Sequence, residues 1–78
     1  MVFTYVLKSE YSNHWYVGVT SNARRRLAEH NAGKSVYTQK FRPWKLRMCV
    51  TFQMREKAEK FERYLKSHSG RAFMKKHF

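Results

Sequence analysis

The sequence predicts a single α+β domain over residues 1–78, in which a small three-stranded antiparallel sheet is flanked by helices in the order β-β-α-β-α-α. Segments rich in β-branched and aromatic residues predict the strands, and apolar residues at helical spacing predict the helices. A length of 78 residues leaves room for one domain only. A chain of this size buries about 60% of its unfolded surface, so we expect a thin core.

Three segments have the composition of strands. Residues 2–7 and 15–20 are rich in Val, Thr, Tyr and Trp, and residues 9–13 between them favour a turn. We therefore expect these two strands to form an antiparallel hairpin. Residues 46–52 are the expected third strand, which is reached through a polar and basic connection over residues 34–45.

The helices are marked by their ends and by their apolar spacing. Ser21 and Asn22 are both able to cap a helix that runs through about Ala32, and Gly33 follows in the position that often ends a helix. A second helix is expected from Met54 onward, where apolar residues recur at spacings of three and four: Ala58, Phe61 and Leu65.

The last part of the chain continues the helical pattern after one interruption. Ser69 and Gly70 break the spacing of the apolar residues, so we expect the second helix to end before them. Residues 71–78 can then form a short last helix.

The charge balance is strongly positive. Seventeen Lys and Arg residues oppose five Glu, and Asp is absent, which gives a formal net charge of +12. Such a charge weakens the compact state by self-repulsion, so a polyanionic partner is a physical reason to keep it. Nucleic acid fits best, since binding its phosphates releases condensed counterions; a merely soluble basic protein is the alternative. Six residues are the expected phosphate contacts: Arg24, Arg25, Lys34, Lys40, Arg42 and Lys45.

Cysteine content and hydropathy bear on the compartment. Cys49 is the only cysteine, which excludes an internal disulfide and favours a reducing environment. We expect its side chain to be buried in the third strand. No apolar run reaches the roughly 20 residues that a membrane span needs, and the N-terminus lacks the pattern of a signal peptide. We therefore expect a cytoplasmic protein that does not enter a membrane.

The first predicted helix carries a candidate pair for phosphate chemistry. Arg26 and His30 are four residues apart, so they lie on one face of the helix, one turn apart. A guanidinium fork can hold a phosphate while negative charge develops, and a neighbouring imidazole can donate or accept a hydrogen bond. Equally, the three arginines at residues 24–26 can be a solvated basic turn without a chemical role.

Two tyrosines and one carboxylate complete the candidate set. Tyr5 and Tyr16 lie on the two strands of the expected hairpin, where cross-strand pairing can bring their hydroxyls together; they can also be ordinary core or rim residues. Gly18 inside a strand indicates a bulge or the close approach of another backbone. Glu62 lies at the margin of the apolar stripe, where it can bind a hard cation or form only a surface ion pair with Lys66.

Taken together, these segments resemble the GIY-YIG nuclease domain over nearly the whole chain. Phe-Thr-Tyr at residues 3–5 stands where the family has Gly-Ile-Tyr, and Tyr-Val-Gly at residues 16–18 matches its second triplet, Tyr-Ile-Gly. Residues 22–27 and 29–31 resemble its Asn-x-x-x-Arg-Leu helix with a downstream His or Tyr, and residues 57–62 resemble the helix with its metal-binding Glu. The chain looks like a member of a small stand-alone branch of this family, which is related to the nuclease domain of the excinuclease C subunit.

The resemblance implies a metal-dependent endonuclease that hydrolyses phosphodiester bonds in DNA with one Mg²⁺ or Mn²⁺ ion. It assigns Tyr5 and Tyr16 to orient or deprotonate the attacking water. It also implies that Arg26 steadies the scissile phosphate with the assistance of His30, and that Glu62 holds the metal. Branched, nicked or damaged DNA is the expected substrate, as in DNA repair; RNA is an alternative, because phosphate contacts alone do not distinguish the two.

Three positions depart from the family pattern. Phe3 replaces the Gly of the first triplet, and Val19 stands where some members have a Lys after the second triplet. The late Asn that some members carry near the site has no equivalent after Asn31. A catalytically weak nucleic-acid-binding module of the same fold is therefore the alternative function. A further protein could supply the targeting for which many relatives use an additional DNA-binding domain.

DNA binding is expected to depend steeply on salt. If the six basic residues between positions 24 and 45 supply about 5 phosphate contacts, the logarithm of the binding constant falls against the logarithm of salt concentration with a slope of about −4 to −5. A salt titration followed by fluorescence anisotropy measures this slope. An affinity that stays flat between low and moderate salt contradicts an electrostatic interface.

Overall fold

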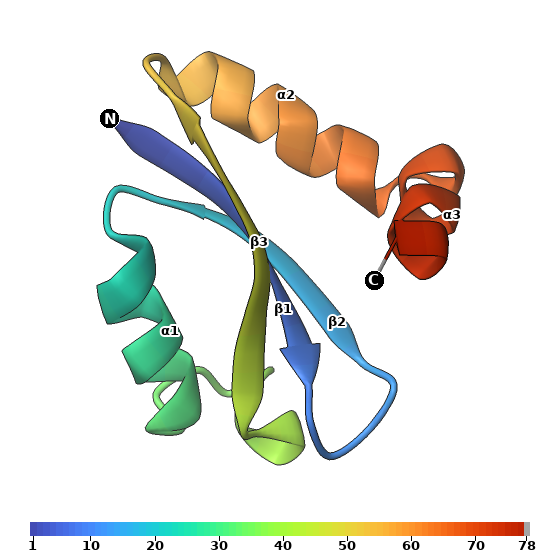
Figure 1. Cartoon of the computed structure of the whole chain (residues 1–78). Helices are drawn as coiled ribbons and strands as arrows, with labels where there is room; N and C mark the ends of the chain where they lie inside the picture. Colours follow the sequence, from blue (N-terminus) through green and yellow to red (C-terminus); the bar gives the residue numbers. More distant parts are fainter. Residues whose placement is uncertain (78) are drawn as a thin grey trace.

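The computed structural model describes residues 1–77 and shows the predicted α+β fold (Figure 1). Its three strands form one antiparallel sheet: β1 (Val2–Ser9), β2 (Trp15–Thr20) and β3 (Trp44–Phe52). The helical elements of this part of the chain are α1 (Ala23–Asn31), a 3-10 turn (Gln39–Phe41), α2 (Arg55–Lys66) and α3 (His68–His77). The order β-β-α-β-α-α is confirmed; Phe78, the last residue of the predicted domain and of its last helix, lies outside the described residues.

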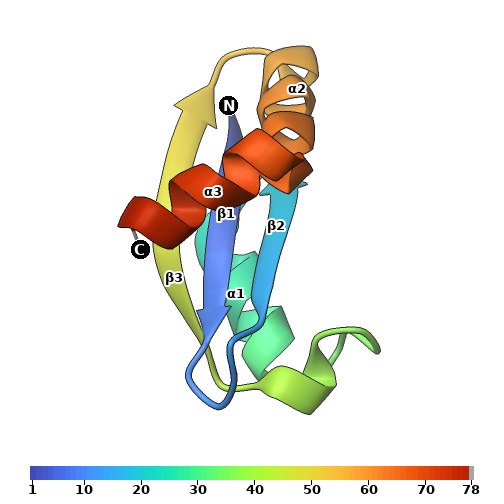
Figure 2. The same cartoon turned by 90° about the vertical axis from the view of Figure 1, so that its right-hand side faces the viewer.

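Strand β1 is the centre of the sheet, in which the strands have the order β2-β1-β3. Helix α1 lies on one face of the sheet, and α2 and α3 lie on the other (Figure 1 and Figure 2). Because successive side chains of a strand point to opposite faces, β1 contributes to two cores. Val6 packs with Val17, Leu65 and Met74 on the α2–α3 side. On the α1 side, the second core contains three buried residues: Tyr5, Leu7 and Trp44.

Asn31 fixes the point at which β3 begins. Its side-chain oxygen accepts a hydrogen bond from the Trp44 backbone N–H at 2.5 Å, and its amide nitrogen donates to the Trp44 carbonyl at 3.1 Å. These two hydrogen bonds join the end of α1 to Trp44. Strand β3 therefore begins at Trp44, two residues before the predicted start of the third strand. Trp44 is buried, and its indole N–H donates to the Thr38 carbonyl at 2.9 Å.

The predicted break at Ser69 and Gly70 is wrong, since both residues lie inside α3. The break falls at Ser67, which ends α2 and whose hydroxyl accepts a hydrogen bond from the Gly70 backbone N–H at 3.2 Å. Gly70 is buried, and a Cβ there would overlap the backbone of Tyr64 and Leu65. The glycine therefore serves the close approach of α3 to the end of α2, which a pattern of apolar residues does not reveal.

Cys49 was expected to be buried, and this expectation is wrong. Its register partner on the central strand is Tyr5, which is buried, but Cys49 itself is exposed, since β3 is an edge strand. Within residues 1–77, no helix combines the length and the apolar character that crossing a membrane requires.

Candidate functional site

Tyr5 and Tyr16 lie on the same face of the hairpin, beside the glycine of β2. Tyr5 pairs with Gly18 across the two strands, and the rings of Tyr5 and Tyr16 are 6.2 Å apart between centroids. A Cβ at Gly18 would lie 2.5 Å from the Tyr5 hydroxyl oxygen. Gly18 therefore makes room for a side chain, the Tyr5 phenol. The prediction of a bulge or of a close backbone approach at Gly18 is wrong, since the register of β1 with β2 is uninterrupted there and the nearest atoms belong to the Tyr5 side chain.

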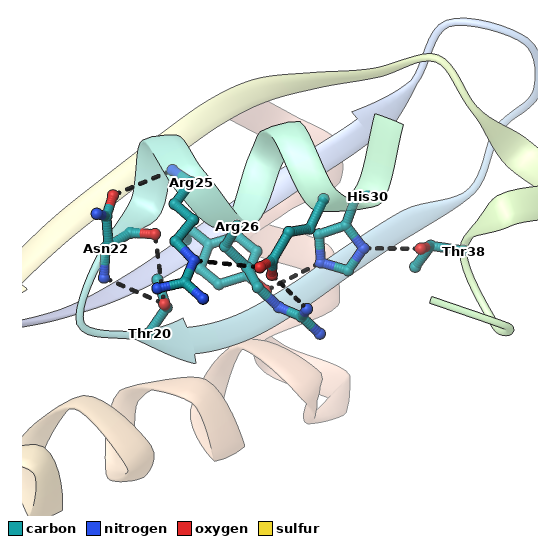
Figure 3. Close-up of polar contacts among 8 residues, drawn as sticks. Thr20, Asn22, Arg25, Arg26, His30 and Thr38 are labelled. Atoms are coloured by element: carbon teal, nitrogen blue, oxygen red, sulfur yellow. Dashed lines mark hydrogen bonds and ion pairs between the residues drawn. The ribbon is translucent and has the colours of Figure 1, made fainter. Parts of the chain in front are cut away.

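A chain of buried hydrogen bonds runs from Tyr5 through His30 to Thr38. The Tyr5 hydroxyl lies 3.1 Å from His30 Nε2, and His30 Nδ1 lies 2.7 Å from the Thr38 hydroxyl (Figure 3). Tyr5 is 2% exposed, and His30 and Thr38 are fully buried. Both ring nitrogens of His30 thus have a partner, which fixes the orientation of the imidazole between strand β1 and the loop after α1.

Burial keeps both members of the Tyr5–His30 pair neutral. Burial raises the pKa of Tyr5 to about 12; the nearby Tyr16 phenol adds to the rise, and the Arg26 guanidinium opposes it. Burial also lowers the pKa of His30, and the Arg26 cation lowers it further. A phenol with a raised pKa stays protonated at neutral pH, and an imidazole with a lowered pKa stays uncharged there.

Arg26 is the arginine that faces this pair. Its Nη1 donates to one carboxylate oxygen of Glu29 at 3.0 Å, and the Arg25 Nε donates to the other at 3.3 Å (Figure 3). The Arg25 side chain is 76% exposed, whereas that of Arg26 is 35% exposed and close enough to Tyr5 to affect its pKa. The bond to Glu29 raises the pKa of Arg26, and the same bond lowers the pKa of Glu29. Glu29 therefore orients the Arg26 guanidinium.

Arg26 is accessible from an open depression of about 200 Å³ at the start of α1. Thr20 and Asn22 belong to its rim (Figure 3). Asn22 also accepts a hydrogen bond from the Arg25 backbone N–H at 3.0 Å, as expected for the residue that caps α1. An anion that enters this depression would meet the guanidinium of Arg26 and the amino end of the helix.

Glu62 lies on the opposite side of the sheet from α1 and affects Tyr5 through its charge. It lies on α2, and its negative charge contributes to the raised pKa of Tyr5. Its side chain is 24% exposed and accepts a hydrogen bond from Lys66 Nζ at 3.0 Å, so the ion pair that the spacing allows is present. The structure thus brings four of the five predicted residues together, namely Tyr5, Tyr16, Arg26 and His30, whereas Glu62 acts on Tyr5 through its charge.

The residues predicted to contact phosphates are all exposed, and they are spread over α1, the loop that follows it and the start of β3: Arg24, Arg25, Lys34, Lys40, Arg42 and Lys45. Two residues of the site were not predicted. Thr38 lies in a connection without any periodic pattern, so no local signal marks it. Glu29 could have been found, because it lies three residues after Arg26 and four after Arg25, where helical side chains meet.

The fold agrees with what sequence comparison finds. A model of the GIY-YIG catalytic domain matches residues 1–77. The domain is therefore of a class whose members include nucleases. More particularly, the chain belongs to the GIY-YIG catalytic domain family.

Its relatives within that family include small proteins named UPF0213. The UPF0213 protein lwe0147 of Listeria welshimeri is 43% identical over 68 residues, which are 86% of this chain and 74% of that protein. The UPF0213 protein YazA of Bacillus subtilis is 37% identical over 65 residues, which are 82% of this chain but less than two thirds of that protein, 65%. The solution NMR structure of the UPF0213 protein BH0048 from Bacillus halodurans is similar, with a TM-score of 0.56 and 28% identity over 95% of this chain and 82% of that one.

Gly18→Ala is expected to disturb the Tyr5–His30 bond. The added methyl group would lie 2.5 Å from the Tyr5 hydroxyl, so the ring must move. We expect the free energy of unfolding to fall by about 1–3 kcal/mol and the Nε2 resonance of His30 to shift in NMR spectra. Val19→Ala is the matched control, because Val19 is the next residue on β2 and points to the other face. A His30 resonance that is unchanged in Gly18→Ala contradicts this account.

Proposed function

We propose that this protein is a metal-dependent endonuclease that hydrolyses phosphodiester bonds in DNA and acts in the cytoplasm on branched or damaged DNA. The observation that carries the proposal is the Arg26 guanidinium, which Glu29 holds beside the Tyr5 hydroxyl at the rim of an open depression. An oriented guanidinium can stabilise the charge that develops on a phosphate. The net charge of +12 supports a nucleic-acid substrate.

Tyr5 acts in this proposal by orienting its neighbours, and not as a base. With a pKa of about 12 its hydroxyl stays protonated at neutral pH, whereas an efficient general base has a pKa near the working pH. The hydroxyl can donate a hydrogen bond or accept one from Arg26. Tyr16 is partly exposed, so its hydroxyl is the more accessible of the two for orienting a water molecule.

His30 is a positioning residue in this proposal. Its imidazole is fully buried, so it has no surface to offer to a substrate phosphate. Its hydrogen bonds to Tyr5 and Thr38 instead hold the phenol in place. Its assistance to catalysis is therefore indirect, through the position of the Tyr5 hydroxyl.

One Mg²⁺ or Mn²⁺ ion is part of the proposal, with Glu62 as its protein ligand. In the part of the chain that the structure describes, no three His, Cys, Asp or Glu side chains are grouped so as to hold a metal. A single half-buried carboxylate fits Mg²⁺, which often binds one or two carboxylates and completes its shell with waters and substrate phosphates. When bound, the ion would supply positive charge to the phosphate and to the attacking water.

The second candidate function is a nucleic-acid-binding module with little catalysis. The ion pair of Glu62 with Lys66 favours it, because a carboxylate that is already paired has to be released before it can bind a metal. Incubation with supercoiled, branched and single-stranded DNA, in Mg²⁺, Mn²⁺ or EDTA, separates the two functions. The same assay with RNA tests the alternative substrate, and an added cell extract tests whether a further protein supplies targeting.

Arg26→Ala is expected to reduce the cleavage rate about 100-fold or more, as the loss of one donor to developing charge does in other enzymes. Arg24→Ala and Arg25→Ala remove the same charge but are expected to weaken binding slightly and to leave the rate at saturating DNA nearly unchanged, since both residues are exposed. Arg26→Lys keeps the charge and loses the fork. Single-turnover kinetics on all four variants measure these effects, and equal losses in the three alanine variants would favour the binding module.

Glu62→Gln is expected to abolish metal-dependent cleavage while DNA binding in EDTA stays equal or becomes slightly tighter. The substitution keeps the shape of the side chain and removes the anionic ligand. Glu59→Gln is the matched control, because Glu59 lies on the same helix and pairs with Arg55 as Glu62 pairs with Lys66. If Glu62→Gln cuts DNA at the wild-type rate, Glu62 is only the partner of Lys66.

A further inference from the structure

A groove of about 970 Å³ lies along the edge strand β2, where Tyr16 lines it from the α1 side and further residues line it from the face that carries α2 and α3. Figure 2 shows α3 crossing this face next to the end of α2. Val17, Leu65 and Met74 line the groove and belong to the buried core below it, so its floor is apolar. Its volume is at the upper end of the range of ligand pockets, about 300–1,000 Å³.

The charged side chains of the groove are basic. Arg71 and Lys75 lie one turn apart on α3, and Lys66 lies at the end of α2. All three are exposed, and among the described residues that line the groove none is acidic. Within residues 1–77, Arg71 and Lys75 form no ion pair with a carboxylate. These two cations are therefore available to an anion from outside the chain.

Aromatic side chains also line the groove. Tyr37, from the loop after α1, is 65% exposed and packs against Tyr16, with 6.2 Å between the ring centroids. Both residues line the groove. Exposed aromatic rings beside basic side chains are the surface on which proteins stack unpaired bases while they hold the backbone phosphates.

Tyr16 connects the groove to the candidate site. Its ring centroid lies 4.8 Å from that of His30 and 6.2 Å from that of Tyr5, so one side chain borders both features. A strand whose phosphate lies at Arg26 can therefore continue past Tyr16 into the groove. The six basic residues predicted from the sequence lie elsewhere, and none of them lines this groove.

The chemistry of the groove favours one occupant. An apolar floor with a basic rim fits a polyanion that carries flat apolar rings, which is an unpaired nucleic-acid strand. The bases of a duplex are stacked inside the helix and do not reach such a floor unless they are unpaired. A second copy of this chain would bring a further +12 of net charge to a surface that is already basic, and the repulsion disfavours it.

We propose that the groove between β2 and α3 binds unpaired nucleotides next to the phosphodiester at Arg26, so that the substrate is single-stranded or carries an unpaired flank. The proposal names the substrate class of the nuclease activity proposed above and rests on it. Arg71 and Lys75 bind phosphates, and the Tyr37 ring stacks with a base. The groove thereby selects strands by the absence of pairing and not by base sequence.

Binding measured without cleavage tests the assignment. A fluorescein-labelled single-stranded oligonucleotide and the duplex of the same sequence are titrated in EDTA, and anisotropy is recorded. The double variant Arg71→Ala/Lys75→Ala is compared with Lys57→Ala/Lys60→Ala, which removes two exposed charges from α2 outside the groove. We expect the groove variant to bind the single strand about tenfold more weakly than this control does, and the two variants to bind the duplex equally.

Tyr37→Ala provides a second test that leaves the charge unchanged. We expect it to weaken single-strand binding about fivefold or more, whereas Tyr11→Ala, an exposed tyrosine outside the groove, has no such effect. Equal losses in groove and control variants, or equal losses for single strand and duplex, would overturn the proposal. So would a groove variant that changes the oligomeric state in analytical ultracentrifugation. These binding measurements need no metal. A protein that does not cleave DNA in the earlier assay can therefore be distinguished from one whose groove does not bind single strands.

Discussion

The buried hydrogen bond between the Tyr5 hydroxyl and His30 Nε2 joins the sheet to helix α1, and the candidate site is arranged around it. The bond exists because Gly18 leaves space for the phenol and because the Thr38 hydroxyl holds the second nitrogen of the imidazole. A buried polar group that loses its partner costs about 1–3 kcal/mol, which is a large share of the stability of a small domain. Residues that support the fold and residues that form the site are therefore partly the same residues.

Local patterns were sufficient to predict the order of the elements and several of the candidate residues that lie together. The hairpin predicts that Tyr5 and Tyr16 are neighbours, and they are, because side chains of paired strands alternate together. The period of a helix predicts that Arg26 and His30 share one side of α1. In the structure His30 is hydrogen-bonded to the Tyr5 hydroxyl, and Arg26 lowers the pKa of Tyr5. The role of Glu62 as a metal ligand remains a prediction.

Contacts between distant segments could not be predicted in this way. Thr38 meets His30 only because the loop after α1 folds back over the helix, and Asn31 sets the start of β3 through the backbone of Trp44. Neither contact has a period or a spacing that a sequence shows. The burial of His30 has the same origin, since helical geometry places it beside Arg26 but does not say that the imidazole faces the interior while the guanidinium remains accessible.

The corner at Ser67 has a consequence for how this chain can vary in length. Ser67 alone separates α2 from α3, and its hydroxyl accepts a hydrogen bond from the Gly70 backbone N–H of α3. One inserted residue would turn α3 by about 100° about its own axis, which would carry Arg71 and Lys75 away from the groove and Met74 away from the core. Surface connections usually tolerate insertions and deletions. Here, however, the number of residues between α2 and α3 is itself a structural constraint. Homologous chains that keep this groove are therefore expected to keep a corner of the same length.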